Sequence, residues 1–540
     1  MPGCCCVPRP FQPTQYSMQK TELPQTHDQS TPLSRRIALV HSPTLLLLLT
    51  VVSFVVAGEN ENEIGSPRAK SKPFISDSWE LIEVSGAAAG YGRIREHAIE
   101  RDGLRLHQIE SVMRMRMRRL GQPVEAAITI QSTFDARGRM VDFRTETNLG
   151  GQAIISTGQF RGKRLEITTD QGGTVTTDLI DWNEETHGFF YEQRLLEKNP
   201  MRSGEQRTFA SLLPIFNRVA RTTLIAGDWS QTEVLGASKE LLPITSRTML
   251  AGQQLSATIW MDRDGQIVKT EEPTLGQTVT RTTREKALAG KRAAPPDLIT
   301  ETVIPLKSGS QELVEATHAK YLVRTARPLT TAPFPSSSCQ ACTATDDAHV
   351  WNLRVTADGN SEPLRENLAD LPTALDRKPN RFIDQNDVAI RRLASQVGLV
   401  DGQEALAKQL TREVYRWITR KDFSTVLATA TEVARTRSGD CTEHAVLLAA
   451  VARARGLPAR VVVGLVYVPS LGGFAYHMWN QIWCDEAWRF FDATRSDGEC
   501  GAGHIKVTDD ALSDENGLAV FLPVLQVMGG TEISLISSSD

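Results

Sequence analysis

Between residues 76 and 288, apolar and polar residues alternate along most of the chain. Segments such as AAITIQSTFDARGRMVDFRTETN and QQLSATIWMDRDGQIVKTEEPT have the period of two that is typical of half-buried strands. Turn-forming residues separate them at 135–138 and 262–265. The pattern predicts a large, mostly antiparallel sheet with one solvated face. SLLPIFNRVAR, residues 211–221, is predicted to be a short helix within it.

The stretch MRMRMRR, from Met113 to Arg119, is the one conspicuously basic run in this region. Because Met and Arg alternate strictly, it predicts a strand with an apolar and a solvated face rather than a phosphate-binding patch. This half of the chain shows no metal cluster, phosphate loop or nucleophile arrangement, so its predicted role is scaffold or binding surface.

Two irregular stretches follow the β-rich region. KRAAPPD, residues 291–297, is typical of a linker, and PLTTAPFPSSS, residues 328–338, is a second interruption. Near them, THAKYLVRTA and HVWNLRVTA predict short strands of a small intermediate β region.

After Pro379 the pattern becomes helical, with Leu406, Leu410 and Val414 at helix spacing and Trp417 or Ile418 continuing it. The alanine-rich run after Cys441 predicts another helix, which Gly456 and Pro458 would end. ARVVVGLVYV then predicts a strand, and YHMWNQIWC and WRFFDAT predict a hairpin that turns at DEA. Helices followed by an antiparallel sheet predict an α+β fold class.

Length and composition add limits. A chain of 540 residues predicts two to four domains, and 40% apolar with 23% charged residues is typical of globular proteins. The net charge of -4 gives no overall basic surface, so no nucleic-acid partner is expected.

The N-terminus indicates export. Arg35 and Arg36 precede TLLLLLTVVSFVVA, whose 14 residues are fewer than the roughly 20 that a spanning helix needs. A basic flank, a short apolar core and small residues before the cut predict a signal peptide over 1–57, cleaved after Ala57. The alternative is an uncleaved membrane anchor, and the long polar lead leaves Met18 open as the true start.

Five cysteines remain after residue 57: Cys339, Cys342, Cys441, Cys484 and Cys500. An odd number in an oxidising compartment leaves one thiol unpaired. Local pairing predicts Cys339 with Cys342 and Cys484 with Cys500, which leaves Cys441 free. Idle thiols at the CxxC pair are the alternative, and a redox or zinc protein is a third reading of that pair.

Cys441 lies in SGDCTEHAVLLAA, where a polar turn becomes a predicted helix. The unpaired N–H groups at a helix N-terminus favour a thiolate and can hold the oxyanion of a tetrahedral intermediate. A half-buried structural cysteine that happens to open a helix is the alternative.

His477 is the candidate base, and Asp492, on the partner strand of the predicted hairpin, is the candidate group that orients it. His444 lies one helical turn after Cys441 and is an alternative base. Because that spacing would hold its ring against the side of the helix, it is expected instead to satisfy a buried hydrogen bond, as is Glu443. His504 falls in a glycine-rich loop and has no predicted partner.

GDCTEHAVLLAAVARARGLPARVVVGLVY, YHMWNQIW and WRFFDAT together resemble the transglutaminase-like superfamily, which is papain-like. The resemblance covers about 380–500, and it implies Cys441 as nucleophile, His477 as base and Asp492 as orienting acid. It also implies an oxyanion donor upstream of the cysteine, for which Trp417 and Gln409 are candidates by residue type.

The sequence therefore predicts a periplasmic or secreted thiol enzyme that acts on amide bonds through an acyl-enzyme, either as a protease or amidase or as an acyltransferase. Its substrates would be proteins, peptides or cell-wall peptides, and no cofactor or metal is expected. The alternative is a non-catalytic envelope scaffold. The predicted boundaries are a signal peptide over 1–57, a linker over 58–75, a β-rich domain over 76–290, a linker and intermediate region over 291–379, a catalytic domain over 380–510 and an extension over 511–540.

Overall fold

The computed structural model describes residues 74–539, apart from 120, 149–152, 172, 275, 290–294, 298–301, 307–310, 327, 330, 357–370, 423–426, 514–517 and 528–529. The predicted signal peptide and most of the KRAAPPD linker lie outside the described residues. All described residues belong to one compact unit within Leu39–Asp540. Among the helices described, none is both long enough and apolar enough to cross a membrane.

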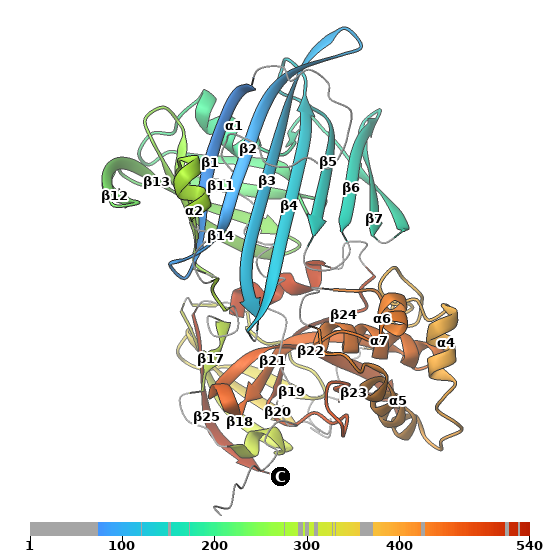
Figure 1. Ribbon diagram of the computed structural model, residues 1–540. Helices are drawn as coiled ribbons and strands as arrows, with labels where there is room; N and C mark the ends of the chain where they lie inside the picture. The colour runs from blue at the N-terminus through green and yellow to red at the C-terminus, as the bar shows by residue number, and fades with distance from the viewer. Residues whose placement is uncertain are drawn as a thin grey trace, which may run out of the picture. The chain divides into compact units, whose positions relative to one another are not determined.

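A sheet of 16 described strands dominates the N-terminal half (Figure 1). Its main path runs in the order β8-β7-β6-β5-β4-β3-β2-β1-β16-β15-β14-β13-β11-β10-β9, and β12 pairs with β13 beside it. The strands are β1 (Phe74–Val84), β2 (Ala87–Arg101), β3 (Leu104–Arg119), β4 (Gln122–Phe134), β5 (Met140–Asn148), β6 (Ile154–Arg161), β7 (Arg164–Gln171), β8 (Thr174–Asp181), β9 (Thr186–His187), β10 (Gln206–Leu213), β11 (Arg218–Ala226), β12 (Ser230–Val234), β13 (Ala237–Leu250), β14 (Gln253–Met261), β15 (Ile267–Glu272) and β16 (Gln277–Thr282). Helices α1 (Tyr191–Lys198) and α2 (Arg284–Ala289) accompany them.

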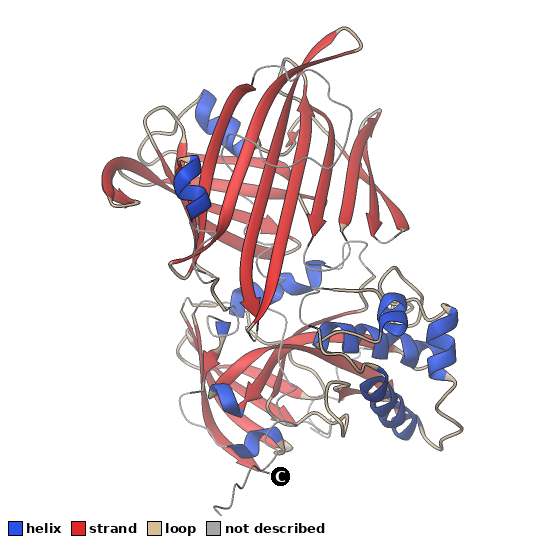
Figure 2. Ribbon diagram, in the orientation of Figure 1, coloured by secondary structure: helices blue, strands red, loops and turns tan. Residues whose placement is uncertain are grey.

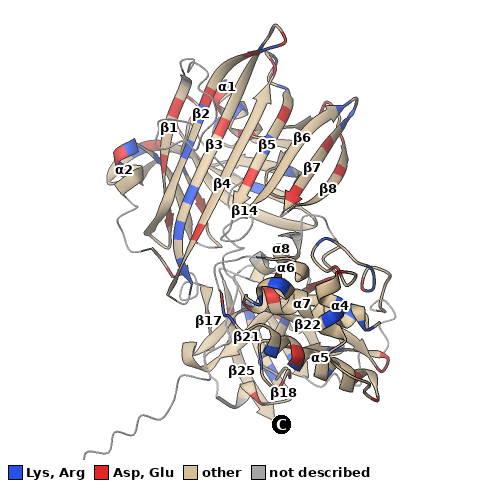
Figure 3. Ribbon diagram, turned by 45° about the vertical axis from the view of Figure 1, so that its right-hand side comes forward, with Lys and Arg blue, Asp and Glu red and all other residues tan. Residues whose placement is uncertain are grey.

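The period of two in the sequence sets the two faces of these strands. In β3, Met113, Met115 and Met117 are buried, whereas Arg114 and Arg116 between them are exposed. Each strand from β1 to β8 pairs antiparallel with the next, so the sheet is the predicted meander. Charged residues recur as separate bands along the strands in Figure 3. The prediction of two faces in MRMRMRR is therefore confirmed from Met113 to Arg118, whereas Arg119 is buried.

The helix predicted over Ser211–Arg221 is wrong. The segment is a hairpin in which β10 and β11 pair from Leu213 with Arg218 outward. Pro214 lacks the N–H that a helix would use, and Ile215 and Asn217 take positive φ angles of 74° and 51° in the turn.

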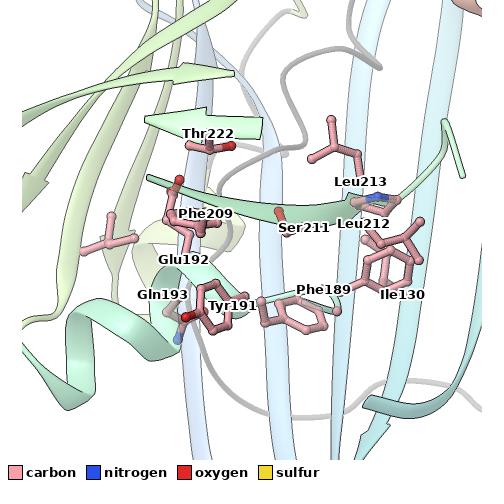
Figure 4. A pocket seen from close by; sticks show the side chains of 14 residues that line it. Ile130, Phe189, Tyr191, Glu192, Gln193, Phe209, Ser211, Leu212, Leu213 and Thr222 are labelled. Atoms are coloured by element: carbon pink, nitrogen blue, oxygen red, sulfur yellow. The ribbon is translucent and has the colours of Figure 1, made fainter. Parts of the chain in front are cut away.

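A small cavity of about 50 Å³ lies in this region, with room for a few water molecules. Figure 4 shows the aromatic side chains of Phe189, Tyr191 and Phe209 and the hydroxyl of Ser211 along its wall. It is too small to take a peptide.

A second sheet joins the intermediate region to the C-terminus. Its order is β19-β20-β18-β25, built from β18 (His318–Thr325), β19 (Gln340–Ala344), β20 (Val350–Thr356) and β25 (Thr531–Ser539). The sequence pattern did not predict that residues after 530 would return to pair with β18.

The third sheet has the order β17-β22-β21-β24, with β23 paired to β22. Its strands are β17 (Ile304–Pro305), β21 (Ala459–Val468), β22 (Gly473–Cys484), β23 (Ala487–Phe491) and β24 (His504–Asp510). The helices of this half are α4 (Val388–Ala394), α5 (Gln403–Trp417), α6 (Ala430–Thr436), α7 (Cys441–Ala454) and α8 (Leu522–Val527), and the short 3-10 helices are η4 (Gln311–Val314), η7 (Pro469–Leu471) and η8 (Leu518–Phe521). Helix α7 packs on β21 and β22, so helices on an antiparallel sheet confirm the α+β class (Figure 2).

The predicted disulfides are wrong, because all five described cysteines are free thiols. The Cys339 sulfur faces the Trp488 carbonyl, and Cys500 packs in the same small apolar cluster as Cys339. Cys484 ends β22, outside that cluster. The thiols that were matched by closeness in sequence therefore have different neighbours in the fold.

Candidate active site

Helix α7 begins at Cys441, as predicted, and Asp440 is its N-cap. The Asp440 carboxylate accepts hydrogen bonds from the Thr442 backbone N–H at 2.8 Å and from the Thr442 hydroxyl at 3.0 Å. Glu443 accepts from the Asp440 N–H at 3.0 Å and from the Ala428 N–H at 3.1 Å. This capping box holds the first helical turn in place and confirms the hydrogen-bonding role predicted for Glu443.

Gly439 makes this cap possible. Its φ of 151° lies in a region that favours glycine, and an added Cβ would stand 2.2 Å from the Cβ of Glu443. The small residue in the SGDC turn thus lets the Glu443 side chain fold back over the chain before the helix.

The Cys441 thiol is buried, with 2% of the residue exposed. Burial and the neighbouring Asp440 carboxylate raise the pKa of the thiol well above its usual range, while Arg119 and the backbone N–H of Met478 act in the opposite direction. The sequence had suggested that the helix N-terminus favours thiolate. In this conformation desolvation outweighs that influence, since the charged form loses its water.

The β22–β23 hairpin brings His477 and Asp492 together. Asp485 and Glu486, both with positive φ, form its two-residue turn, and Asn480 pairs with Phe491. The next pair in this register places Asp492 opposite Trp479. Trp479 and His477 are two residues apart on β22, so Asp492 and His477 lie on the same face of the hairpin. The His477 Nε2 lies 2.8 Å from an Asp492 carboxylate oxygen, and both side chains are fully buried.

Cys441 reaches the same strand. The backbone N–H of Met478, the residue after His477, donates to its sulfur. The Asn480 side chain, two residues further along β22, donates to the carbonyl of Ala445 on α7 at 2.9 Å. These contacts fix the start of the helix against the strand that carries the candidate base. No motif in the sequence indicates this role of Asn480.

The Asp492 carboxylate is saturated with donors. One oxygen accepts from the Thr494 N–H at 2.9 Å and from its hydroxyl at 2.7 Å, and the other contacts His477 and, at 3.3 Å, His504. Burial alone would raise the pKa of Asp492, but the charge of His477 and the hydrogen bonds from His477 and His504 hold it well below its usual range. Asp492 therefore stays ionised although it is fully buried.

His504, for which the sequence predicts no partner, begins β24 and is buried against Asp492. Burial lowers its pKa. The ligand atoms of His477, Asp492 and His504 lie within 4.8 Å of one another, so the group has the residue types of a metal site. In this structure both histidine rings contact the same Asp492 carboxylate oxygen.

His444 satisfies a buried hydrogen bond, as expected. Its Nδ1 donates to the Asp440 carbonyl, and its Nε2 accepts from the Lys421 ammonium at 3.0 Å. Burial and the charge of Lys421 lower the pKa of His444 to about 3, so its ring is neutral.

Neither Trp417 nor Gln409, the two candidates by residue type, is positioned to donate to an oxyanion at Cys441. The Trp417 indole N–H donates to the Ala434 carbonyl, and Gln409 is exposed on α5. Lys421, which has no counterpart in the sequence prediction, interacts electrostatically with Asp492, Asp440 and Cys441. Its position shortly after α5 in the sequence gave no indication of these interactions.

Residues 392–493 match the family model of the transglutaminase-like superfamily. The chain contains a transglutaminase-like domain. The match lies within the 380–500 stretch that carried the resemblance and confirms it. No curated protein matches the chain significantly.

Solved structures resemble the chain only weakly. A candidate cysteine protease from Cytophaga hutchinsonii is 17% identical, with 42% of this chain and 85% of that chain covered and a TM-score of 0.24. A domain of unknown function from Brucella abortus is 12% identical over 38% of this chain and 96% of that chain, with a TM-score of 0.29. A candidate protease from Parabacteroides distasonis is 11% identical over 63% and 64% of the two chains, with a TM-score of 0.15. These scores are too low to support an argument about this chain.

Proposed function

We propose that the transglutaminase-like domain is an exported thiol enzyme that transfers acyl groups from amide bonds, with Cys441 as nucleophile, His477 as base and Asp492 as orienting acid. The observation that carries the proposal is the 2.8 Å hydrogen bond between His477 and Asp492. His477 directly precedes Met478, whose backbone N–H donates to the Cys441 sulfur.

In the proposed reaction the Cys441 sulfur attacks an amide carbonyl while its proton moves to His477. Because burial holds the thiol protonated, His477 would take the proton as the carbon–sulfur bond forms. His477 then protonates the leaving amine, which breaks the carbon–nitrogen bond and leaves a thioester. Asp492 fixes the imidazole and stabilises its cation.

The tetrahedral intermediate carries an oxyanion at the start of α7. Backbone N–H groups there are suited to stabilise it, and the Lys421 ammonium is the side-chain candidate because it interacts electrostatically with Cys441. Water as acceptor would make the protein a protease or amidase, and an amine would make it a cross-linking acyltransferase. Proteins, peptides and cell-wall peptide stems are the substrates we propose, in the periplasm or outside the cell, where the predicted signal peptide would direct it.

The burial of the site favours one competing candidate, a non-catalytic envelope scaffold that retains the domain. Cys441 and His477 are each 2% exposed and Asp492 is fully buried, so a substrate would need an opening to these side chains that the described residues do not show.

Acylation with p-nitrophenyl acetate separates the two candidates. We expect a burst of p-nitrophenol and an acetyl group on Cys441 that hydroxylamine removes, both lost in Cys441→Ala and retained in the matched control Cys484→Ala. Addition of methylamine would report whether water or an amine accepts the acyl group. If acetylation of Cys441 is no faster than that of Cys484, the scaffold explanation holds.

A further inference from the structure

One arginine breaks the two-faced pattern of strand β3. Met113, Met115 and Met117 occupy its buried face, and the next position of the same face is Arg119. Arg119 is fully buried, with none of its side chain exposed, whereas Arg116 on the opposite face is about half exposed. An arginine in the buried phase of a strand requires a partner, because an unpaired buried charge is very costly.

The partner lies in the transglutaminase-like domain. The Arg119 guanidinium forms an ion pair with the carboxylate of Asp440, whose side chain is 1% exposed. Asp440 already uses its other carboxylate oxygen to cap α7. A residue of the large sheet thus completes the N-terminus of the helix on which Cys441 is the first residue.

Without a counter-charge, the Asp440 carboxylate would make Cys441 a poorer nucleophile, although Asp440 caps the helix on which Cys441 lies. A carboxylate beside the sulfur opposes the build-up of negative charge on it, and Asp440 does raise the pKa of Cys441. Arg119 acts in the opposite direction on the same thiol. The Arg119 charge therefore balances the charge of the carboxylate that caps the helix.

We propose that Arg119 is a positioning residue of the candidate active site. It lies at the end of strand β3, where its guanidinium neutralises the carboxylate of Asp440 beside the nucleophile. The proposal rests on the proposed function. In this proposal the large sheet is part of the catalytic centre rather than a separate binding module, because without Arg119 the charge of Asp440 at the N-terminus of α7 would be unbalanced.

Other charged groups also face the Cys441 thiol. Glu443, on α7 itself, raises its pKa, and its own pKa of about 8 falls within the pH range to be tested. Lys421 approaches from the segment after α5, and His477 lies on β22 beside Met478. Because variants of Arg119 retain all three groups, differences between their pH profiles report on Arg119.

The test is the rate of iodoacetamide alkylation at Cys441 in the full chain, located by peptide mass spectrometry between pH 5 and 10. In Arg119→Met, we expect the midpoint to rise by about one pH unit and alkylation below it to slow about tenfold. Arg119→Lys, which keeps the charge, should fall between wild type and Arg119→Met. Arg116→Gln, on the solvated face of β3, is the matched control and should leave the profile unchanged.

A second variant separates charge from structure. Arg119→Met with Asp440→Asn removes both charges and keeps a residue that caps helices well. Its midpoint should return at least to that of wild type, because the opposing carboxylate is gone. If Arg119 only fills space beside the thiol, removal of the Asp440 charge should give no such recovery.

The outcomes are distinct. The inference is overturned if alkylation of Cys441 in Arg119→Met is unchanged. It is also overturned if alkylation is faster, because Arg119 would then only shield the thiol from the reagent. His477→Gln tells this failure apart from that of the proposed function. A profile that responds to His477→Gln but not to Arg119→Met overturns the inference alone, and one that is indifferent to His477→Gln counts against the proposed function itself.

Discussion

Most ion pairs of the large sheet differ in burial from the ionisable groups that surround Cys441 in the transglutaminase-like domain. In the sheet, the ion pairs lie mostly on solvated faces, as in Arg164 with Asp181, whose side chains are 58% and 88% exposed. Around Cys441, the ionisable side chains of Asp440, Glu443, His477 and Asp492 are buried. Exposed pairs contribute little to stability, whereas buried charges are costly unless they are paired and hydrogen-bonded.

This contrast in burial indicates which region contains the functional site. A region that leaves its charges in water can tolerate changes among them. A region that buries four ionisable groups within one helical turn and one hairpin needs every hydrogen bond that satisfies them, and such clusters are typical of functional sites. Arg119 connects the two regions, because it lies on a strand of the large sheet and forms an ion pair with the buried carboxylate of Asp440.

The largest effect should come from Asp492. With Asp492→Asn the side chain keeps its size but no longer carries the charge that stabilises the His477 cation, and the amide favours the wrong tautomer. We expect acyl transfer to fall by about 10⁴-fold. Asp497→Asn is the matched control, because Asp497 lies close in sequence but is 47% exposed and pairs with Arg495. Equal losses in the two variants would remove the distinction between buried and exposed carboxylates.

Arg119 tests the same contrast through stability. Arg119→Met leaves Asp440 buried without its counter-ion, so the free energy of unfolding should fall by about 3–5 kcal/mol. Arg116→Gln, three positions earlier on the same strand, should change it by less than about 0.5 kcal/mol. Urea denaturation measures both. If the two variants lose similar amounts, burial of the ion pair has no energetic consequence and the comparison fails.

The sequence predicted the parts of the fold that local periodicity determines. The meander, the helix from Cys441 and the hairpin that joins His477 to Asp492 follow from alternation, a capping residue and turn chemistry. The hairpin even specifies their proximity, because its two-residue turn at Asp485 and Glu486 sets the register.

What the sequence could not predict are contacts between segments far apart in the chain. The Asp440–Arg119 pair spans more than 300 positions, and His504 reaches Asp492 only because β24 pairs with β21. Nothing local indicates which residue of MRMRMRR will meet a carboxylate. The disulfide prediction was wrong for the same reason. Closeness in sequence paired Cys484 with Cys500, whereas in the fold Cys500 packs near Cys339.

Glu443 and Asp492 should give opposite responses of stability to pH. Burial raises the pKa of Glu443 to about 8, so its contribution to stability is complete below its unfolded value near 4.5 and is lost as pH rises through 8. The pKa of Asp492 is lowered, so its contribution is present above its unfolded value and is lost as pH falls through the folded one. In Glu443→Gln the free energy of unfolding should therefore vary less between pH 5 and 8 than in wild type. An unchanged slope would show that Glu443 is ionised in the folded protein.

The smallest effect is expected where an ion pair of good geometry lies in water. Arg164 Nε is 2.9 Å from an Asp181 carboxylate oxygen, a normal hydrogen-bond distance, yet both side chains are largely solvated. Arg164→Gln should lower the free energy of unfolding by less than about 1 kcal/mol, and added salt should reduce the difference further because it screens the pair in wild type. Urea denaturation at low and high ionic strength measures this. A loss as large as that of Arg119→Met would mean that pairing, and not burial, decides what a charge contributes in this protein.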